Sequence, residues 1–351
     1  MVVSEIFYRP IYRLFWHGSR ALSTTLPLAF YAPEEIDFIG FKSVARHLPP
    51  MYYITQNKAV KAAVQQRGLT PKPLFSFPEV LITSRHAMHR FPSSKIISIG
   101  MRHGPYHFKR MTRAANYNRF DLYLFSSSAD LAAAEEIGVK VGKAIGFPAL
   151  DAAFDGSITP DELQALRNKY RLQQDKPSLL FTATWDKANM SAIDRWLPHL
   201  PRLAHRYNIM VTLHPWVSPA YRKALAALPF VNPVAPPELI KSVMLADVCI
   251  GDQSSVLAYC SALDKPMITF ALPPAARSLP EIDELIKSFS LSIESFNELE
   301  AAIQACLEHP AELHQARMEA NRLMFDALDG QAGLRAANAI KELLTSRGIK
   351  C

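Results

Sequence analysis

The chain of 351 residues is about twice as long as a typical single domain of ~100 to 200 residues, so its length favours two domains. Hydrophobic residues make up 49% of it and charged residues 20%, which excludes a disordered chain and suits buried cores. The formal net charge of +7 suits anionic partners, such as phosphorylated ligands, anionic membranes or nucleic acids, without choosing among them.

The N-terminal part of the chain contains neither a signal peptide nor an apolar stretch of the ~20 residues that cross a bilayer. We therefore expect a cytoplasmic protein that is neither secreted nor membrane-spanning. Residues 8–31 mix Arg9, Arg13 and Arg20 with aromatic and aliphatic side chains, a combination that favours peripheral contact with an anionic bilayer surface. A packed helix at a domain edge, or the start of a first strand, is the alternative interpretation.

The cysteines and the basic residues exclude two kinds of site. The four cysteines are scattered, without the C-x-x-C or Cys/His spacing of a zinc site, and two lie in apolar runs, as buried thiols of the cytoplasm do. The basic residues are dispersed and form no recognisable nucleic-acid-binding module. We therefore expect no metal and no nucleic-acid partner.

From Pro50 onward, short apolar runs alternate with polar or helix-forming segments. The runs 51–55, 79–83, 95–100 and 121–127 predict strands, 129–138 predicts a helix that ends at Gly138, and 141–151 predicts a strand and a turn. Strands that alternate with helices form a parallel sheet. The first domain is expected to close here.

The second half of the chain repeats this pattern. Thr159 is expected to cap a helix of ~14 residues, and strands are predicted at 178–184, 209–215, 247–252 and 266–270, with helical stretches at 191–207, 238–246 and 254–263. Amphipathic helices follow from residue 295 onward. The prediction is an α/β fold of two Rossmann-like domains, 1–155 and 156–330, facing a cleft, with a C-terminal helix at 331–351 that packs on the sheet or returns to the first domain.

Ligands of open parallel sheets bind at the carboxyl ends of the strands, so residues that follow the apolar runs are the candidate site residues. His103 and Gly104 follow the run 95–100, where an imidazole can act as a general base and a glycine lets a substrate approach the backbone. Lys109 comes shortly after them. Taken alone, each of these residues has an ordinary structural explanation.

Three more places end strands of the second domain. Thr184, Trp185 and Lys187 combine a hydroxyl, an aromatic ring and an ammonium group that can meet a base and a phosphate, and His214 can donate to a phosphate oxygen. In the third place, Asp252 precedes Ser254 and Ser255, which start an apolar helix whose free amides can cradle a pyrophosphate. Simple N-capping by serine is the alternative.

The order of these motifs resembles the CDP-glycerol glycerophosphotransferase family. The sequence reads His-Gly at 103–104, Ile-Gly-Phe-Pro-Ala-Leu-Asp at 145–151, Ala-Thr-Trp at 183–185, His-Pro at 214–215, and Ala-Asp-Val-x-Ile-x-Asp-x-Ser-Ser-Val at 246–256, followed by Leu-Asp-Lys-Pro. Residues 246–270 are the most specific part. The resemblance implies a fold of the GT-B type and a CDP-activated polyol phosphate donor bound mainly by the second domain.

The resemblance also implies a reaction. A hydroxyl of a cell-surface glycan or lipid-linked acceptor attacks the distal phosphorus of the donor and expels CMP, with His103 as the catalytic base. His214 has the second catalytic role through the donor phosphate, which Ser254 and Ser255 also contact. Gly104, Lys109, Thr184, Trp185, Lys187 and Asp252 are the other substrate-binding candidates. No cofactor and no metal is required.

This sequence departs from the family pattern at several positions. Arg102 replaces the usual aromatic residue before His-Gly, and Lys109 lies one residue further on than usual. Asp186 and Lys187 follow Ala-Thr-Trp where an arginine is usual, Gln253 replaces the tyrosine of Asp-Tyr-Ser-Ser, and Tyr259 replaces an acidic residue. We expect acceptor recognition and donor identity to differ accordingly.

Two other functions remain open on sequence alone. A glycosyltransferase or nucleotide-sugar epimerase on the same fold would hold a UDP-sugar or CMP-sugar with the same segment. A catalytically silent binding protein of capsule assembly would also explain the altered residues. A donor screen separates these functions, because only the polyol phosphate prediction gives CMP from CDP-glycerol or CDP-ribitol.

Overall fold

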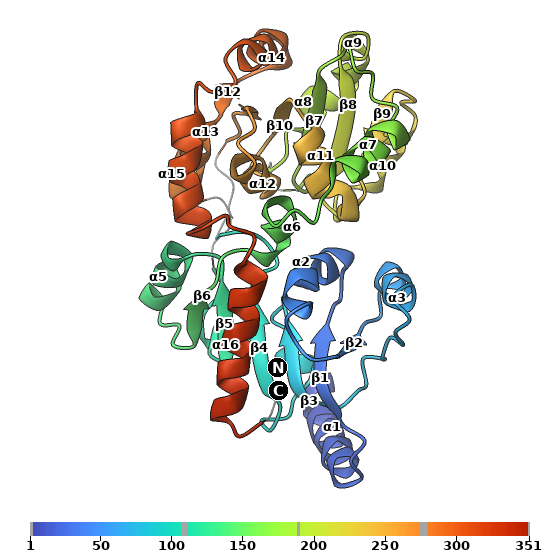
Figure 1. Ribbon diagram of the computed structural model, residues 1–351, viewed down its shortest axis with the longest axis vertical. Helices are drawn as coiled ribbons and strands as arrows, with labels where there is room; N and C mark the ends of the chain where they lie inside the picture. The colour runs from blue at the N-terminus through green and yellow to red at the C-terminus, as the bar shows by residue number, and fades with distance from the viewer. Residues whose placement is uncertain (1–2, 107–110, 188–189, 274–278, 350–351) are drawn as a thin grey trace. The chain divides into compact units, whose positions relative to one another are not determined.

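The computed structural model describes residues 3–106, 111–187, 190–273 and 279–349 (Figure 1). The chain divides into two compact units. The N-terminal unit contains the described residues up to Asp151 and those from Asp329 onward, and the C-terminal unit runs from Ala152 to Leu328. Each unit contains a six-stranded parallel sheet. The α/β fold predicted from the alternating runs is therefore confirmed.

The sheet of the N-terminal unit has the order β2-β1-β3-β4-β5-β6. Its strands are β1 (Leu26–Tyr31), β2 (Tyr52–Ile54), β3 (Pro78–Thr83), β4 (Ile97–Met101), β5 (Leu122–Phe125) and β6 (Gly142–Ala144). The helices of this unit are α1 (Val3–Ala21), α2 (Glu35–Ala45), α3 (Lys58–Gln65), α4 (Ala114–Tyr117), α5 (Ser128–Glu136) and α16 (Ala332–Ser346), with short 3-10 turns η1 (Met88–Arg90) and η2 (Pro148–Leu150). The central strands are almost fully buried because helices cover them.

The C-terminal helix α16 belongs to the N-terminal unit, where it packs against α2. The carboxylate of Asp151 accepts hydrogen bonds from the backbone N–H groups of Ala332 (3.0 Å) and Gly333 (2.7 Å) and from the Ser43 hydroxyl (2.5 Å). An acidic group at a helix start satisfies amides that have no partner within the helix. Asp151 therefore joins α16 to α2.

Gly333 has no room for a side chain at this junction. A Cβ atom placed there would lie 2.2 Å from the Ser43 hydroxyl oxygen and 2.7 Å from the Ser43 backbone carbon. We expect Gly333→Ala to lower the free energy of unfolding by about 1–3 kcal/mol, as overpacking does, measured by urea denaturation. Gly18→Ala in α1, where nothing lies within 4 Å of a new Cβ, is the control and should not be destabilising. Equal stability of the two variants would contradict the close approach.

The sheet of the C-terminal unit has the order β12-β11-β10-β7-β8-β9. Its strands are β7 (Ser178–Ala183), β8 (Asn208–Leu213), β9 (Val231–Pro233), β10 (Val248–Gly251), β11 (Met267–Phe270) and β12 (Leu291–Ile293). Its helices are α7 (Pro160–Lys169), α8 (Ile193–Trp196), α9 (Leu200–Leu203), α10 (Pro219–Ala226), α11 (Leu239–Leu245), α12 (Val256–Ala262), α13 (Pro280–Phe289), α14 (Leu299–Glu308) and α15 (His314–Phe325), with 3-10 turns η3 (Leu197–His199), η4 (Pro236–Glu238) and η5 (Phe296–Glu298); α6 (Asp151–Phe154) lies where the two units join in sequence.

Two predicted helices differ from the structure. The helical stretch expected at 191–207 is broken into α8, η3 and α9, because Pro198 and Pro201 cannot donate the backbone hydrogen bonds of a continuous helix. Helix α7 starts at the predicted cap, where Thr159 and Glu162 form a capping box, but it spans 10 residues instead of ~14. It stops early because Arg171 adopts a positive φ of 50°.

Candidate active site

His103 lies just beyond the carboxyl end of β4 in the N-terminal unit. The segment that carries it is held by Arg102, which donates from Nε to Asp130 at 2.8 Å and pairs with the second oxygen of the same carboxylate through Nη2. Asp130 lies in the first turn of α5 and is fully buried, and its backbone N–H is capped by Ser127. Arg102 therefore anchors the His103 loop to α5.

The pKa of His103 is lowered by several neighbours. Desolvation by the surrounding protein is the largest cause, followed by the guanidinium charges of Arg85 and Arg102, while a hydrogen bond to the Ser84 backbone acts in the opposite direction. His103 nevertheless keeps an exposed surface, so its desolvation is incomplete and the repulsion by the two arginines is the firmer cause. The imidazole is neutral at pH 7 and can accept a proton.

Arg85 and His86 lie beside His103, and the sequence analysis missed both. Arg85 donates to Asp37 (2.8 Å) and Glu34 (3.0 Å) at the start of α2. The ring of His86 stacks on Tyr123 with centroids 5.7 Å apart. Both residues follow β3. The expectation that ligands bind at the carboxyl ends of strands, which identified His103 after β4, would also have identified them after the run 79–83.

In the C-terminal unit, β10, β7 and β8 are neighbours in the sheet, so the motifs that follow them share one edge. The carboxylate of Asp252 is buried and accepts hydrogen bonds from the backbone N–H groups of Thr184 (3.0 Å) and Ala192 (3.1 Å) and from the Ser191 hydroxyl (3.0 Å). Asp252 therefore holds the segment after β7 against the end of β10. Substrate contact by Asp252 stays a prediction beside this observed role.

His214 follows β8, and its ring is oriented by the backbone. Its Nδ1 accepts a hydrogen bond from the backbone N–H of Trp216 at 3.1 Å. Because Nδ1 is an acceptor in this bond, the proton of the neutral imidazole lies on Nε2. Arg222 holds the same segment by donating to the carbonyl oxygens of His214 (2.7 Å) and Pro215 (2.9 Å). These contacts fix the orientation of the His214 segment.

Ser254 and Ser255 lie at the start of α12. Ser254 is buried, and its hydroxyl accepts hydrogen bonds from the Thr182 hydroxyl (3.2 Å) and the Val256 backbone N–H (3.3 Å). Ser255 occupies the N-cap position, but its side chain makes no capping hydrogen bond. Ser254 thus satisfies the first backbone N–H of α12, as the N-capping alternative predicts for a serine here, whereas Ser255 does not cap the helix.

Trp216 contacts His214, and Trp185 contacts Trp216. The ring of Trp216 is 56% exposed and lies 5.5 Å from the His214 ring and 5.8 Å from the Trp185 ring, measured between centroids. Trp185 is less exposed, and its Nε1 donates to the sulfur of Met190 at 3.2 Å. Trp216 was not predicted as a site residue, although its position directly after His214-Pro215 is a signal that the sequence contains.

The structure shows fewer contacts for the other predicted site residues. Gly104 has open space around it, because nothing lies within 4 Å of the position that a Cβ atom would occupy there. Lys187 is exposed after β7, and the preceding Asp186 binds the backbone N–H of Ser218 at 2.8 Å. Lys109 lies outside the described residues. No group of three or more His, Cys, Asp or Glu side chains in the described part of the chain is arranged to hold a metal ion.

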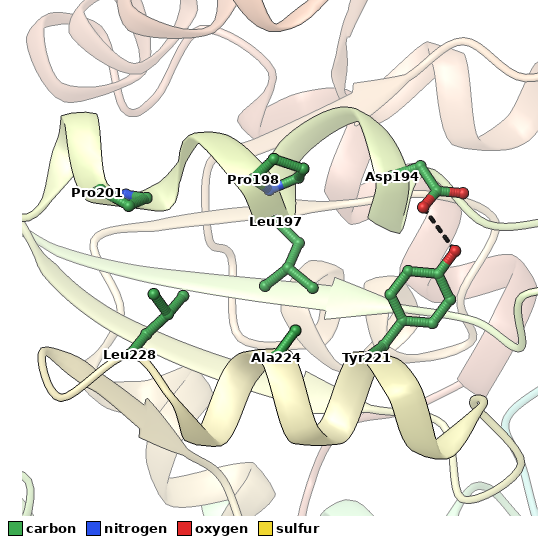
Figure 2. Close-up of a pocket in the computed structure, with 7 residues that line it drawn as sticks. All are labelled: Asp194, Leu197, Pro198, Pro201, Tyr221, Ala224 and Leu228. Carbon is green, nitrogen blue, oxygen red and sulfur yellow. Dashed lines mark hydrogen bonds between the residues drawn. The ribbon is translucent and has the colours of Figure 1, made fainter.

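A groove of about 340 Å³ in the C-terminal unit lies away from these motifs. Figure 2 shows it between the α8–η3 segment and α10, with the Tyr221 hydroxyl donating to Asp194 at 2.5 Å. Its lining consists of Asp194, Leu197, Pro198, Pro201, Tyr221, Ala224 and Leu228. None of the predicted site residues lines this groove, so the site is defined by the strand ends and not by this cavity.

Two units that each contain a six-stranded parallel sheet, with the predicted site residues following their strands, have the architecture of the GT-B class. Solved structures with this fold include the wall teichoic acid polymerase TagF, at a TM-score of 0.68 and 13% identity with 99% of each chain covered. They also include S. aureus MnaA in a co-structure with UDP, at a TM-score of 0.65 and 13% identity, covering 92% of this chain and 97% of that one.

A third structure of this fold is a putative UDP-N-acetylglucosamine 2-epimerase from Listeria monocytogenes, at a TM-score of 0.62 and 10% identity, covering 92% of this chain and 97% of that one. A comparison with curated proteins finds no match. Residues 94–342 match the family described as CDP-Glycerol:Poly(glycerophosphate) glycerophosphotransferase. The chain belongs to this family, and it is a glycerophosphotransferase with a CDP-activated donor.

Proposed function

We propose that this transferase moves glycerol phosphate, or a similar polyol phosphate, from its CDP-linked donor to a hydroxyl of a cell-surface glycan or lipid-linked acceptor. The observation that carries the proposal is the position of His214, whose Nδ1 accepts from the Trp216 backbone N–H, on the same sheet edge as Ser254 and Ser255. An imidazole N–H group and a helix start on one sheet edge suit the two phosphates of a nucleoside diphosphate.

The reaction follows from these groups. His103, neutral at pH 7, takes the proton of the acceptor hydroxyl, and the oxygen attacks the distal phosphorus of the donor. The bond from this phosphorus to the bridging oxygen breaks, and the electron pair leaves with CMP. His214 donates from Nε2 to the phosphate of the departing CMP, and such a donor typically stabilises the transition state by ~3 to 4 kcal/mol. Positioning and charge stabilisation supply the rest.

The tryptophans beside His214 suit the cytosine base. Trp216 presents an exposed aromatic ring next to the phosphate-binding histidine, and stacking of a base on an aromatic side chain contributes ~1–3 kcal/mol. Trp185 supports Trp216 from the neighbouring strand end. The base therefore lies on the β8 side of the edge, and the phosphates extend from it toward β10.

The donor panel tests this function. The purified protein is incubated with CDP-glycerol, CDP-ribitol and several UDP-sugars, each with a lipid-linked glycan acceptor, and nucleotide release is measured. CMP release from a CDP-polyol is the expected result. UDP release from a UDP-sugar would show glycosyl transfer instead, and no release from any donor with a competent acceptor would favour a silent binding protein.

We also propose that the protein acts at the cytoplasmic face of the membrane, through α1. One face of α1 is packed into the N-terminal unit: Tyr12 and Trp16 are fully buried and donate to the carbonyl oxygens of Ser76 and Pro78, each at 2.7 Å. A different face is exposed and apolar. It carries Phe7, Ile11, Leu14 and Phe15, and Leu22 continues it.

The spacing of these exposed residues places them on one stripe of the helix. Phe75 extends the stripe, since its ring lies 5.6 Å from that of Phe15 and is itself 43% exposed. Arg9 and Arg13 lie on the same helix and suit anionic headgroups. No helix in the described part of the chain is long and apolar enough to span a bilayer. Contact of α1 with one leaflet is the arrangement that this surface fits.

A charge placed on the stripe should weaken membrane binding. Leu14→Glu is expected to lower the partition of the protein onto phosphatidylglycerol vesicles by about tenfold or more, because a leucine contributes ~1.5–3 kcal/mol when it leaves water. Vesicle co-sedimentation measures this. Ile137→Glu, at a residue that is 46% exposed and follows α5, is the matched control and should bind like the wild type. Equal binding of the Leu14 variant would exclude α1 as the contact.

A further inference from the structure

Gln253 and Asp283 form a polar pair at the carboxyl end of β10 that none of the catalytic roles uses. The Gln253 Nε2 donates to the Asp283 Oδ1 at 2.8 Å, and both side chains are half-buried. Gln253 stands directly before Ser254 in the chain.

The pair lies on the opposite side of β10 from the tryptophans. Asp252 reaches toward the segment after β7, whereas Gln253 reaches α13, which follows β11 in the chain. In the sheet, β7 and β11 flank β10 on opposite sides. Along the edge, the Gln253–Asp283 pair, the Ser254–Ser255 helix start and His214 with Trp216 therefore follow one another from β11 to β8.

This order fits the parts of a nucleotide-linked polyol. Neighbouring strands lie about 4.8 Å apart, so the edge from β11 to β8 is roughly 14 Å wide. A donor with its phosphates at the centre of this edge has its base at one end and its polyol at the other. The aromatic end suits the flat base, which leaves the amide–carboxylate end for the polyol hydroxyls.

The chemistry of Asp283 supports the same assignment. Its second oxygen, Oδ2, accepts no hydrogen bond from any residue that the structure describes. Burial raises the pKa of Asp283, and Glu284 and Glu281 raise it further, while Lys287 lowers it. A carboxylate near phosphates repels them. Hydrogen bonds that it accepts from hydroxyl groups of the ligand offset this repulsion. Hydroxyl groups are the donors that a polyol offers.

We propose that Gln253 and Asp283 are the specificity-determining contact for the hydroxyl groups of the polyol carried by the donor. This inference rests on the proposed function, because it requires the donor phosphates at Ser254 and Ser255. The Asp283 carboxylate accepts a hydrogen bond from a polyol hydroxyl. The Gln253 amide, next to Ser254 in the chain, donates to the same carboxylate and orients it. The pair therefore distinguishes the polyol-bearing donor from the bare nucleotide.

Calorimetric titration with CDP, CDP-glycerol and CDP-ribitol tests the inference without an acceptor. Asp283→Asn should weaken the affinity for the preferred CDP-polyol by about tenfold, the loss expected for one hydrogen bond to a charged group, and leave the affinity for CDP unchanged. Gln253→Ala, which removes the amide that donates to Asp283, should change the ratio of the CDP-glycerol and CDP-ribitol affinities. Glu308→Gln, at an exposed carboxylate at the end of α14, is the control and should change neither affinity.

Each outcome decides one question. If Asp283→Asn weakens CDP and CDP-polyol binding equally, or weakens neither, the pair does not contact the polyol and this inference is wrong. If the wild type binds CDP-polyols, but its ratio of CDP-polyol affinity to CDP affinity equals that of Asp283→Asn, this inference is wrong and the proposed function stands. If the wild type binds none of the three ligands, the proposed function fails as well. Thermal unfolding of each variant identifies a loss of affinity that comes from misfolding.

Discussion

Replacing His103 with alanine should lower kcat for CMP release by about 100-fold or more, because a general base contributes ~10²–10⁴-fold to such a reaction. The affinity for CDP should not change, since the donor contacts that we propose lie in the C-terminal unit. CMP release in steady state measures kcat, and calorimetry measures the affinity. His89→Ala is the control, because His89 is exposed in η1 and has no role in the proposed reaction.

The role of His103 as a general base also predicts how kcat depends on pH. A general base works in its neutral form, so activity is lost as the pH falls through its pKa. Desolvation and the charges of Arg85 and Arg102 lower the pKa of His103 below the usual value of 6.5. The acid limb of the profile of kcat against pH should therefore lie below pH 6.5. A limb centred at or above that value would contradict the neutral base described here, as would a His103→Ala variant with wild-type kcat.

Replacing His214 is expected to have the second large effect on activity. Two different substitutions test its two ring nitrogens separately. Asparagine keeps an acceptor near the position of Nδ1 for the Trp216 N–H but removes the Nε2 donor, whereas glutamine places an amide N–H₂ near Nε2. We expect His214→Asn to lower kcat/KM by about 100- to 1,000-fold, the loss typical of a removed transition-state donor. His214→Gln should restore part of this loss.

The comparison of the two variants separates catalysis from loop structure. If the Nδ1 bond to Trp216 were the main role of His214, His214→Asn would be nearly as active as the wild type and His214→Gln would be the impaired variant. Thermal unfolding should show that both variants fold. Steady-state CMP release from CDP-glycerol at a fixed acceptor concentration gives kcat/KM for each.

Much of this protein follows from the sequence alone. The apolar runs and the polar breaks between them predict most strands of both sheets, because a strand buried on both faces must be apolar along its length. The same runs locate His103, His214, Ser254 and Ser255, since each directly follows a strand and parallel strands present their carboxyl ends at one edge. The order of these motifs also predicts the family that residues 94–342 match.

Other features depend on contacts between residues far apart in the chain, which local patterns do not encode. Asp252 meets Thr184 across 68 positions, and Arg102 meets Asp130 across 28. Only the folded sheet shows that these two charges hold loops in place. The strands β9 (VNP) and β12 (LSI) were not predicted, because each has a polar residue at its centre and forms no apolar run; each pairs with one neighbouring strand in the folded sheet.

The tertiary structure also decides what local residue types leave open. The sequence places aromatic and basic residues in α1, but only packing determines that Tyr12 and Trp16 are buried while Leu14 and Phe15 face solvent. The sequence places a histidine after β8, but the backbone N–H of Trp216 determines which ring nitrogen carries the proton. Composition and period thus determine which elements form and where polar side chains follow them, whereas hydrogen-bond geometry, set by the whole fold, determines what each side chain can donate or accept.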